Sequence, residues 1–187
     1  TGDLGAGTCS SYGAPTDITG QSSYTVASGH CYRFTLTGTD NVGNSDSVTA
    51  TVKVDTTAPS TPTAISVSGT TNAYYSGTGT TIWFKGGASG GFTVSASGAT
   101  DADSGIASYM NPSLTGFSGQ YSFDPSSTTQ SGDVTATNGA GLTGAGLTIT
   151  AQADTTAPTG GDLTVNGGAA YLNSGTTVTI DATNFAE

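Results

Sequence analysis

Apolar and polar residues alternate along short runs that recur about every ten residues of this 187-residue chain. "CYRFTLTGTD" at 31–40 and "GFTVSASG" at 91–98 are clear examples. A period of two is the pattern of a strand with one buried face, and no helical period interrupts it. The pattern predicts an all-β sandwich or barrel. The predicted strands are 23–28, 31–40, 46–55, 63–69, 80–86, 91–98, 105–110, 119–124, 133–138, 145–154, 161–167 and 176–183.

The phrase DTTAP occurs at 55–59 and again at 154–158, so its two aspartates are 154 − 55 = 99 residues apart. The match extends from 35–69 to 133–167: each copy has a strand, a Gly-containing turn, a second strand, DTTAP and a new strand. This period predicts tandem domains in which DTTAP is the connection. The predicted parts are the C-terminal part of a domain (1–54), a complete domain (55–153) with an inserted hairpin near 76–90, and the N-terminal part of a further domain (154–187).

The connection itself has the composition of a stiff joint. Pro59 and Pro158 fix their own φ and restrict Ala58 and Ala157 to extended conformations. We expect the 187 residues to be an excerpt of a longer chain. An alternative is a filament subunit whose partial domains complete each other between chains.

Charge narrows the classes of partner. The net charge is −10 and only three residues are basic, so the chain is unsuited to nucleic acid or to anionic membrane surfaces. No apolar run is long enough for a membrane span, and we expect no membrane insertion in this segment. A divalent cation, by contrast, suits an acidic chain.

Three segments carry a resemblance to a known family: "GTDNVGN" (38–44), "VDTTAP" (54–59) and "ATDADSGIASY" (99–109). The chain resembles the bacterial immunoglobulin-like tandem repeats of large secreted and cell-surface proteins, in the form found in actinobacterial-type surface proteins. The resemblance implies immunoglobulin-like β-sandwich domains in an elongated extracellular array. It also implies a structural role as the stalk, spacer or fibre of an adhesin-like molecule, with neighbouring repeats as partners.

Two candidate sites follow from particular residues. Cys9 and Cys31 are the only cysteines, and an even count in an exported β-protein predicts a disulfide between them. Calcium prefers oxygen ligands, and some relatives of this repeat type bind it with linker and loop aspartates. The resemblance therefore makes Ca²⁺ plausible at Asp55, Asp101 and Asp103, and we add Asp40 to the candidate set. The alternative is that these residues only stabilise turns.

Aromatic residues offer a second kind of site. Tyr74, Tyr75, Trp83 and Tyr109 are candidates for a platform that binds carbohydrate or another surface ligand. For Trp83 we favour a different role, an aromatic that plugs one end of a small core. Catalysis has little support: His30 is the sole histidine and no nucleophile motif accompanies it. We expect a non-enzymatic protein.

Overall fold

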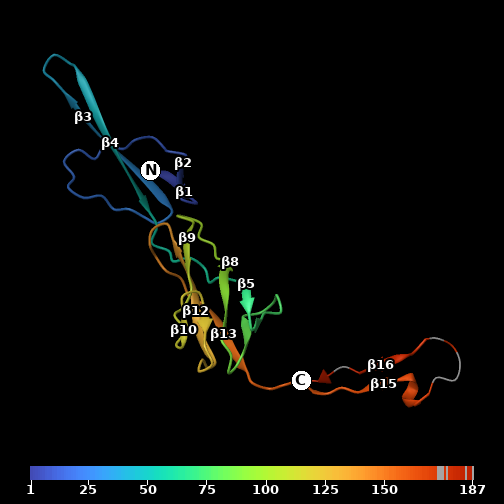
Figure 1. Ribbon diagram of the computed structural model, residues 1–187. Coiled ribbons are helices and arrows are strands. Elements are labelled where there is room, and N and C mark those ends of the chain that lie inside the picture. The colour runs from blue at the N-terminus through green and yellow to red at the C-terminus, as the bar shows by residue number, and fades with distance from the viewer. Residues whose placement is uncertain (172–174, 176, 184, 187) are drawn as a thin grey trace. The chain divides into compact units, whose positions relative to one another are not determined.

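The computed structural model describes residues 1–171, 175, 177–183 and 185–186 (Figure 1). The chain divides into two compact units, Thr1–Ala153 and Asp154–Glu187. In the described residues the structure is nearly all-β, and its one helical turn is a 3-10 turn, η1 (Asn166–Gly168). The predicted boundary between residues 54 and 55 lies inside the first unit.

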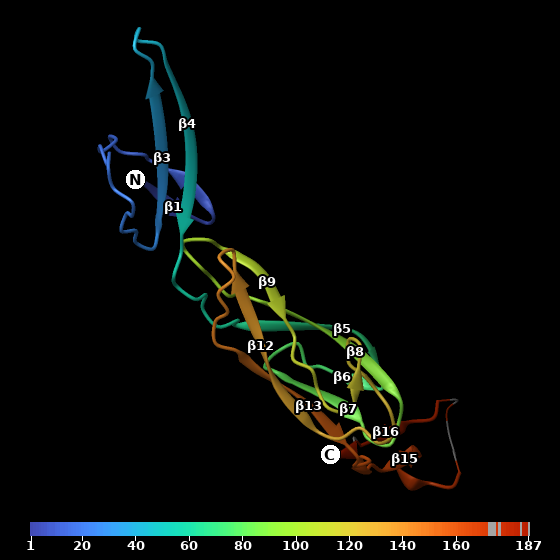
Figure 2. The ribbon, with the colours of Figure 1, turned by 90° about the vertical axis from the view of Figure 1, so that its left-hand side faces the viewer.

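The N-terminal part of the first unit is a four-stranded antiparallel sheet with the strand order β2-β1-β3-β4. Its longest feature is the hairpin of β3 and β4, which pairs from His30↔Val54 to Thr39↔Ser45 without interruption (Figure 2). Thr, Val, Tyr and Phe fill these strands, as expected for residues that favour extended backbone. The strands are β1 (Gly2–Gly5), β2 (Thr8–Ser10), β3 (His30–Thr39) and β4 (Ser45–Val54).

The rest of the first unit is a β-sandwich, in which two sheets pack on one core. The first sheet has the order β10-β11-β8-β5 and the second β6-β7-β13-β12-β9. Their strands are β5 (Ala64–Thr71), β6 (Ala73–Tyr74), β7 (Thr81–Lys85), β8 (Gly90–Ser97), β9 (Ile106–Met110), β10 (Phe117–Ser118), β11 (Ser122–Phe123), β12 (Gln130–Asn138) and β13 (Leu147–Asp154).

Strand alternation explains which side chains enter this core. On β7, Ile82 and Phe84 are fully buried, and the residue between them points outward. Both sheets contribute to a single cluster, made of Ile65, Ile82, Phe84, Phe92, Val94, Leu114, Tyr121, Phe123, Val134, Ile149 and Ala151. Because buried apolar area is the main favourable term in folding, this cluster defines the stable centre of the first unit.

Two hairpin turns in the first unit have the same hydrogen bonds. In the β3–β4 turn, Oδ1 of Asp40 accepts from the amides of Val42 and Asn44, at 2.9 and 2.8 Å. In the turn that follows β12, Oδ1 of Asn138 accepts from the second and fourth residues after it, at 3.1 and 2.9 Å. Both turns also close with the same pair of backbone bonds. Asp and Asn serve equally in these shared backbone bonds because the bonds use only the Oδ1 acceptor.

The second unit contains two short strand pairs. One pairs β15 with β16, with Leu163 opposite Ala182 and Val165 opposite Ile180. The other pairs β14 with β17. Their apolar side chains are exposed, so this unit lacks a core of its own in the described residues. The strands are β14 (Thr159–Gly160), β15 (Leu163–Val165), β16 (Ile180–Ala182) and β17 (Phe185–Ala186).

The all-β prediction is confirmed, with differences in detail. The run 23–28 is not a strand: it is a loop in which the ring of Tyr24 packs edge-on against Tyr32 and Phe34. With no neighbouring strand to pair with, its alternation has no structural effect. The predicted hairpin near 76–90 is formed by β6 and β7, which span 73–85. Thr176, in the predicted run 176–183, lies outside the described residues, and β16 covers the C-terminal part of that run.

Candidate functional site

Four segments of the first unit meet around Asp55, and we call this region the Asp55 joint. They are the β1–β2 turn (5–8), the linker (55–60), the loop that precedes β9 (99–105) and the turn after β12 (138–144). The first segment belongs to the N-terminal sheet, and the last two belong to the sandwich. The joint is therefore where the N-terminal sheet, the DTTAP linker and the sandwich contact one another.

The amide of Asn138 is the centre of the joint. Its Nδ2 lies 2.9 Å from Oδ2 of Asp55, 3.1 Å from Oδ2 of Asp101 and 2.8 Å from the carbonyl oxygen of Thr57. The side chain is almost completely buried. One buried amide thus ties two carboxylates and the linker backbone together. Ser104 adds to this network, since its hydroxyl donates to the same Oδ2 of Asp55.

Asp101 has a second role, which is to shape the loop before β9. Its Oδ1 accepts from the amides of Asp103, Ser104 and Gly105, at 3.1, 2.8 and 3.2 Å. Burial raises the pKa of Asp101, but the hydrogen bonds from Asn138 and from these amides outweigh it, and the pKa lies below its ordinary value. The ionised carboxylate is therefore the form that the joint stabilises.

Asp103 faces the N-terminal sheet. Its Oδ2 accepts from the hydroxyl of Ser28 at 3.0 Å, and its carbonyl oxygen accepts from the amide of Gly7 at 2.8 Å. The amide of Ala6 donates to the carbonyl of Ala102 at 3.0 Å. Ser28 also accepts from the amide of Thr56 at 2.9 Å. These bonds connect the N-terminal sheet to both the linker and the sandwich.

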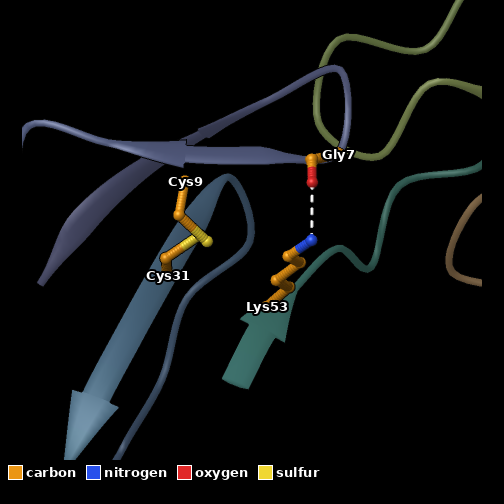
Figure 3. The surroundings of a disulfide bond; sticks show 4 residues. All are labelled: Gly7, Cys9, Cys31 and Lys53. Carbon is orange, nitrogen blue, oxygen red and sulfur yellow. Dashed lines mark hydrogen bonds between the residues drawn. A yellow bond between two sulfur atoms is a disulfide. The ribbon is translucent and has the colours of Figure 1, made fainter. Parts of the chain in front are cut away.

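The disulfide holds this contact surface in place (Figure 3). Cys9 on β2 is bonded to Cys31 on β3, so that prediction is confirmed. The turn between β1 and β2 contains Gly7, whose carbonyl oxygen accepts from Nζ of Lys53 at 2.7 Å. The turn that contacts Asp103 is therefore fixed covalently on one side and by a charged hydrogen bond on the other.

Two glycines permit the close backbone approach in the joint. A Cβ at Gly144 would overlap the carbonyl oxygen of Pro59, and a Cβ at Gly139 would lie 2.7 Å from the carbonyl oxygen of Ser104. Neither glycine has an unusual φ in this structure. The joint therefore requires glycine at these positions for space and not for backbone conformation.

The proposed calcium ligands do not assemble into a calcium site in this arrangement. Asp55 and Asp101 do converge, but on the amide of Asn138, and Asp103 is directed to Ser28. Asp40 lies at the far end of β4, a ten-residue strand, or about 30 Å along the chain from Asp55. Among the residues that the structure describes, no group of three or more His, Cys, Asp or Glu side chains could hold a metal ion.

Of the four candidate aromatic residues, the structure brings two together. Tyr74 on β6 lies directly opposite Trp83 on β7, and both are exposed, at 65% and 46%. Our preferred role for Trp83, the plug of a core, is wrong because Ile82 and Phe84 take the inward positions. Tyr75 packs against the core and donates to the carbonyl of Gly79 at 2.9 Å. Tyr109 accepts from the amide of Ala99 at 3.2 Å.

Chemistry at His30 and Cys31 is limited by their surroundings. Cys31 is fully buried and oxidised, so it provides no thiolate. His30 begins β3, and its Nδ1 is buried without a hydrogen-bond partner.

In the part of the chain that the structure describes, no helix is long and apolar enough to cross a membrane.

Comparison with protein-family models, with curated proteins and with solved structures finds no match to this chain. The geometry of the first unit is therefore the basis for inference about function. The sequence pattern pointed to Asp55, Asp101 and Asp103, but it did not point to Asn138 as the partner of Asp55 and Asp101. A usable signal was present, because Asn138 occupies the position of Asp40 in the repeat.

Proposed function

We propose that the chain is a non-enzymatic structural segment of an extracellular bacterial surface protein, a stiff stalk, spacer or fibre of an adhesin-like molecule built from immunoglobulin-like repeats. The observation that carries this proposal is the Asp55 joint. A connection meant to be flexible would leave the linker free in solvent. Here Asp55 and Thr57 are hydrogen-bonded to Asn138, a buried residue of the sandwich.

The registers of two hairpins support the repeat. Leu36 pairs with Val48 in β3–β4, and Val134 pairs with Leu147 in β12–β13. Leu36 and Val134 each precede the first residue of their turn by four positions, and Val48 and Leu147 each precede the aspartate of the following DTTAP by seven. The second copy has one additional residue between its turn and DTTAP, so its strand register is shifted by one relative to the turn. The same turn and the same apolar pair are expected if both hairpins are the closing strands of the same domain type.

An extracellular location is supported by the disulfide, because such bonds persist in oxidising compartments. The low content of charged residues, 9%, and the abundance of Ser and Thr suit an exposed, protease-tolerant connector. A mechanical role needs no bound cofactor. Each sandwich closes its own core, and the joint determines how well one domain holds the next.

Backbone ¹⁵N relaxation on the whole chain tests this role. In the native protein, amides of β3–β4 and of the sandwich should share one rotational correlation time, because the joint couples them. Replacement of 56–59, TTAP, by a Gly-Ser segment of equal length should separate the two sets of correlation times. Two separate correlation times in the native chain would contradict a stiff connector.

A second function, ligand binding, is favoured by one observation, the exposed Tyr74–Trp83 pair. Adjacent exposed aromatic rings offer stacking surface for a sugar ring. Titration with oligosaccharides should then change the fluorescence of Trp83, the only tryptophan, and Tyr74→Ala should remove the change. An unchanged spectrum across a panel of neutral and acidic glycans would reject this function.

A further inference from the structure

One face of the β3–β4 hairpin is apolar and uncovered near its tip. Paired residues of antiparallel strands share a face, which places Leu36 beside Val48. These side chains are 72% and 65% exposed. Nearer the base, the loop around Ile18 and Tyr24 covers part of the same face, and a groove of about 750 Å³ remains between this loop and Leu36.

The sandwich shows what covers this face in a complete domain. Val134, the counterpart of Leu36, is fully buried, and so is Ala151, the counterpart of Val52. Both lie in the core cluster with Ile65 of β5 and Val94 of β8 from the facing sheet. The cover of a closing hairpin is therefore an opening pair of strands of the β5–β8 type. Among the described residues of the N-terminal sheet, no such pair is present.

The same chain carries an opening pair in its second unit. On β15–β16, Leu163 pairs with Ala182 and Val165 with Ile180. On β5–β8, Ile65 pairs with Ala96 and Val67 with Val94. In both strand pairs, two apolar residues two positions apart on the first strand lie opposite two apolar residues on the second strand.

Exposure distinguishes the two strand pairs. Ile65 and Val94 are buried, whereas Leu163 and Ile180 are 69% and 71% exposed. The apolar face of β15–β16 is uncovered, like that of β3–β4.

We propose that the apolar face of β3–β4 binds the β15–β16 strand pair of a second copy of this chain, so that the two partial domains form one sandwich. This deepens the proposed structural role, because the contact would extend an array from chain to chain. The surface on the first unit differs from the surface on the second. The contact is heterologous and adds copies without closing.

Sedimentation equilibrium on the whole 187-residue chain tests this, at a salt concentration that screens its net charge of −10. The weight-average mass should rise with concentration, up to about 1 mM, beyond that of a dimer. Leu36→Asp places a charge on the apolar face of β3–β4, and Ile180→Asp places a charge on the strand pair that binds this face. For each variant alone, the dissociation constant should be at least about thirtyfold higher, because each substitution removes a large aliphatic side chain from the proposed contact. Met110→Asp, at an exposed apolar residue of β9, adds the same charge elsewhere and should leave association unchanged.

An equimolar mixture of Leu36→Asp and Ile180→Asp gives the decisive result. Each variant keeps the surface that the other lost, so the mixture should form a one-to-one dimer that goes no further. Both positions are exposed, and unchanged melting of the variants confirms that each is folded. A native chain that stays monomeric, a closed dimer, or a mixture that does not pair would overturn the proposal. The relaxation test of the joint is independent of this result, so either proposal can fail alone.

Discussion

Asn138→Asp is the most specific perturbation of the joint, because it replaces the side-chain NH₂ group by an oxygen and keeps the shape of the side chain. Oδ1 continues to accept from the amides of the turn, while the donor Nδ2 becomes an acceptor facing Asp55, Asp101 and the carbonyl of Thr57. An amide has two N–H groups, so at least two hydrogen bonds to charged or buried acceptors are lost. At about 1.5 kcal/mol or more each, plus repulsion among three carboxylates, the free energy of unfolding should fall by about 3–5 kcal/mol.

Urea unfolding followed by the fluorescence of Trp83 measures this change, since the only tryptophan lies in the sandwich. The matched control is Asp40→Asn, the reverse exchange in the equivalent turn. It removes only the solvent-exposed hydrogen bond from Nδ2 of Asn44, so it should destabilise the chain much less than Asn138→Asp does. The loss in Asn138→Asp should shrink below about pH 4, because a protonated carboxyl can donate again. A loss below about 1 kcal/mol at neutral pH, or equal losses in the two variants, would refute the assigned role of the amide.

Four further predictions concern the same unit. Replacing both cysteines by serine should lower the calorimetric stability of the N-terminal sheet by about 3 kcal/mol, and an unchanged melt would contradict a structural disulfide. Gly144→Ala should destabilise the unit by about 1–3 kcal/mol, against no loss in Gly38→Ala, where a Cβ meets open space. Folding lowers the pKa of Asp101, so its contribution to the free energy of unfolding is complete above its ordinary pKa of 3.8 and is lost as the pH falls further. In Asp101→Asn the free energy of unfolding should therefore depend less on pH in the acid range. Chelators should not shift the melting temperature, and a clear drop would restore calcium as a ligand.

The sequence was sufficient to predict most long strands, because their alternation is strong and local. It failed for β1 and β2, whose Gly-rich residues 2–10 carry little alternation. It also misplaced Trp83: "IWF" offers three apolar residues in succession, and only the register with β6 determines which of them point inward. In each case, the missing information was which neighbouring strand the segment pairs with.

The joint was only partly predictable for a related reason. Asp55, Asp101 and Asp103 were identifiable as acidic residues near the linker. Their partners are distant in sequence: Asn138 is 83 residues from Asp55. Whether two carboxylates share a cation or an amide depends on the group that the fold places between them. Composition cannot supply that placement.

The distance between the N-terminal sheet and the sandwich tests the central claim, a stiff joint, most directly. Spin labels on Val42→Cys and Met110→Cys occupy exposed positions on either side of the joint, and the native cysteines are oxidised and do not react. Pulsed electron paramagnetic resonance at monomeric concentration should give one narrow distance distribution, which Asn138→Asp broadens. A distribution in the otherwise native chain that is already as broad as that of the Asn138→Asp variant would contradict the account.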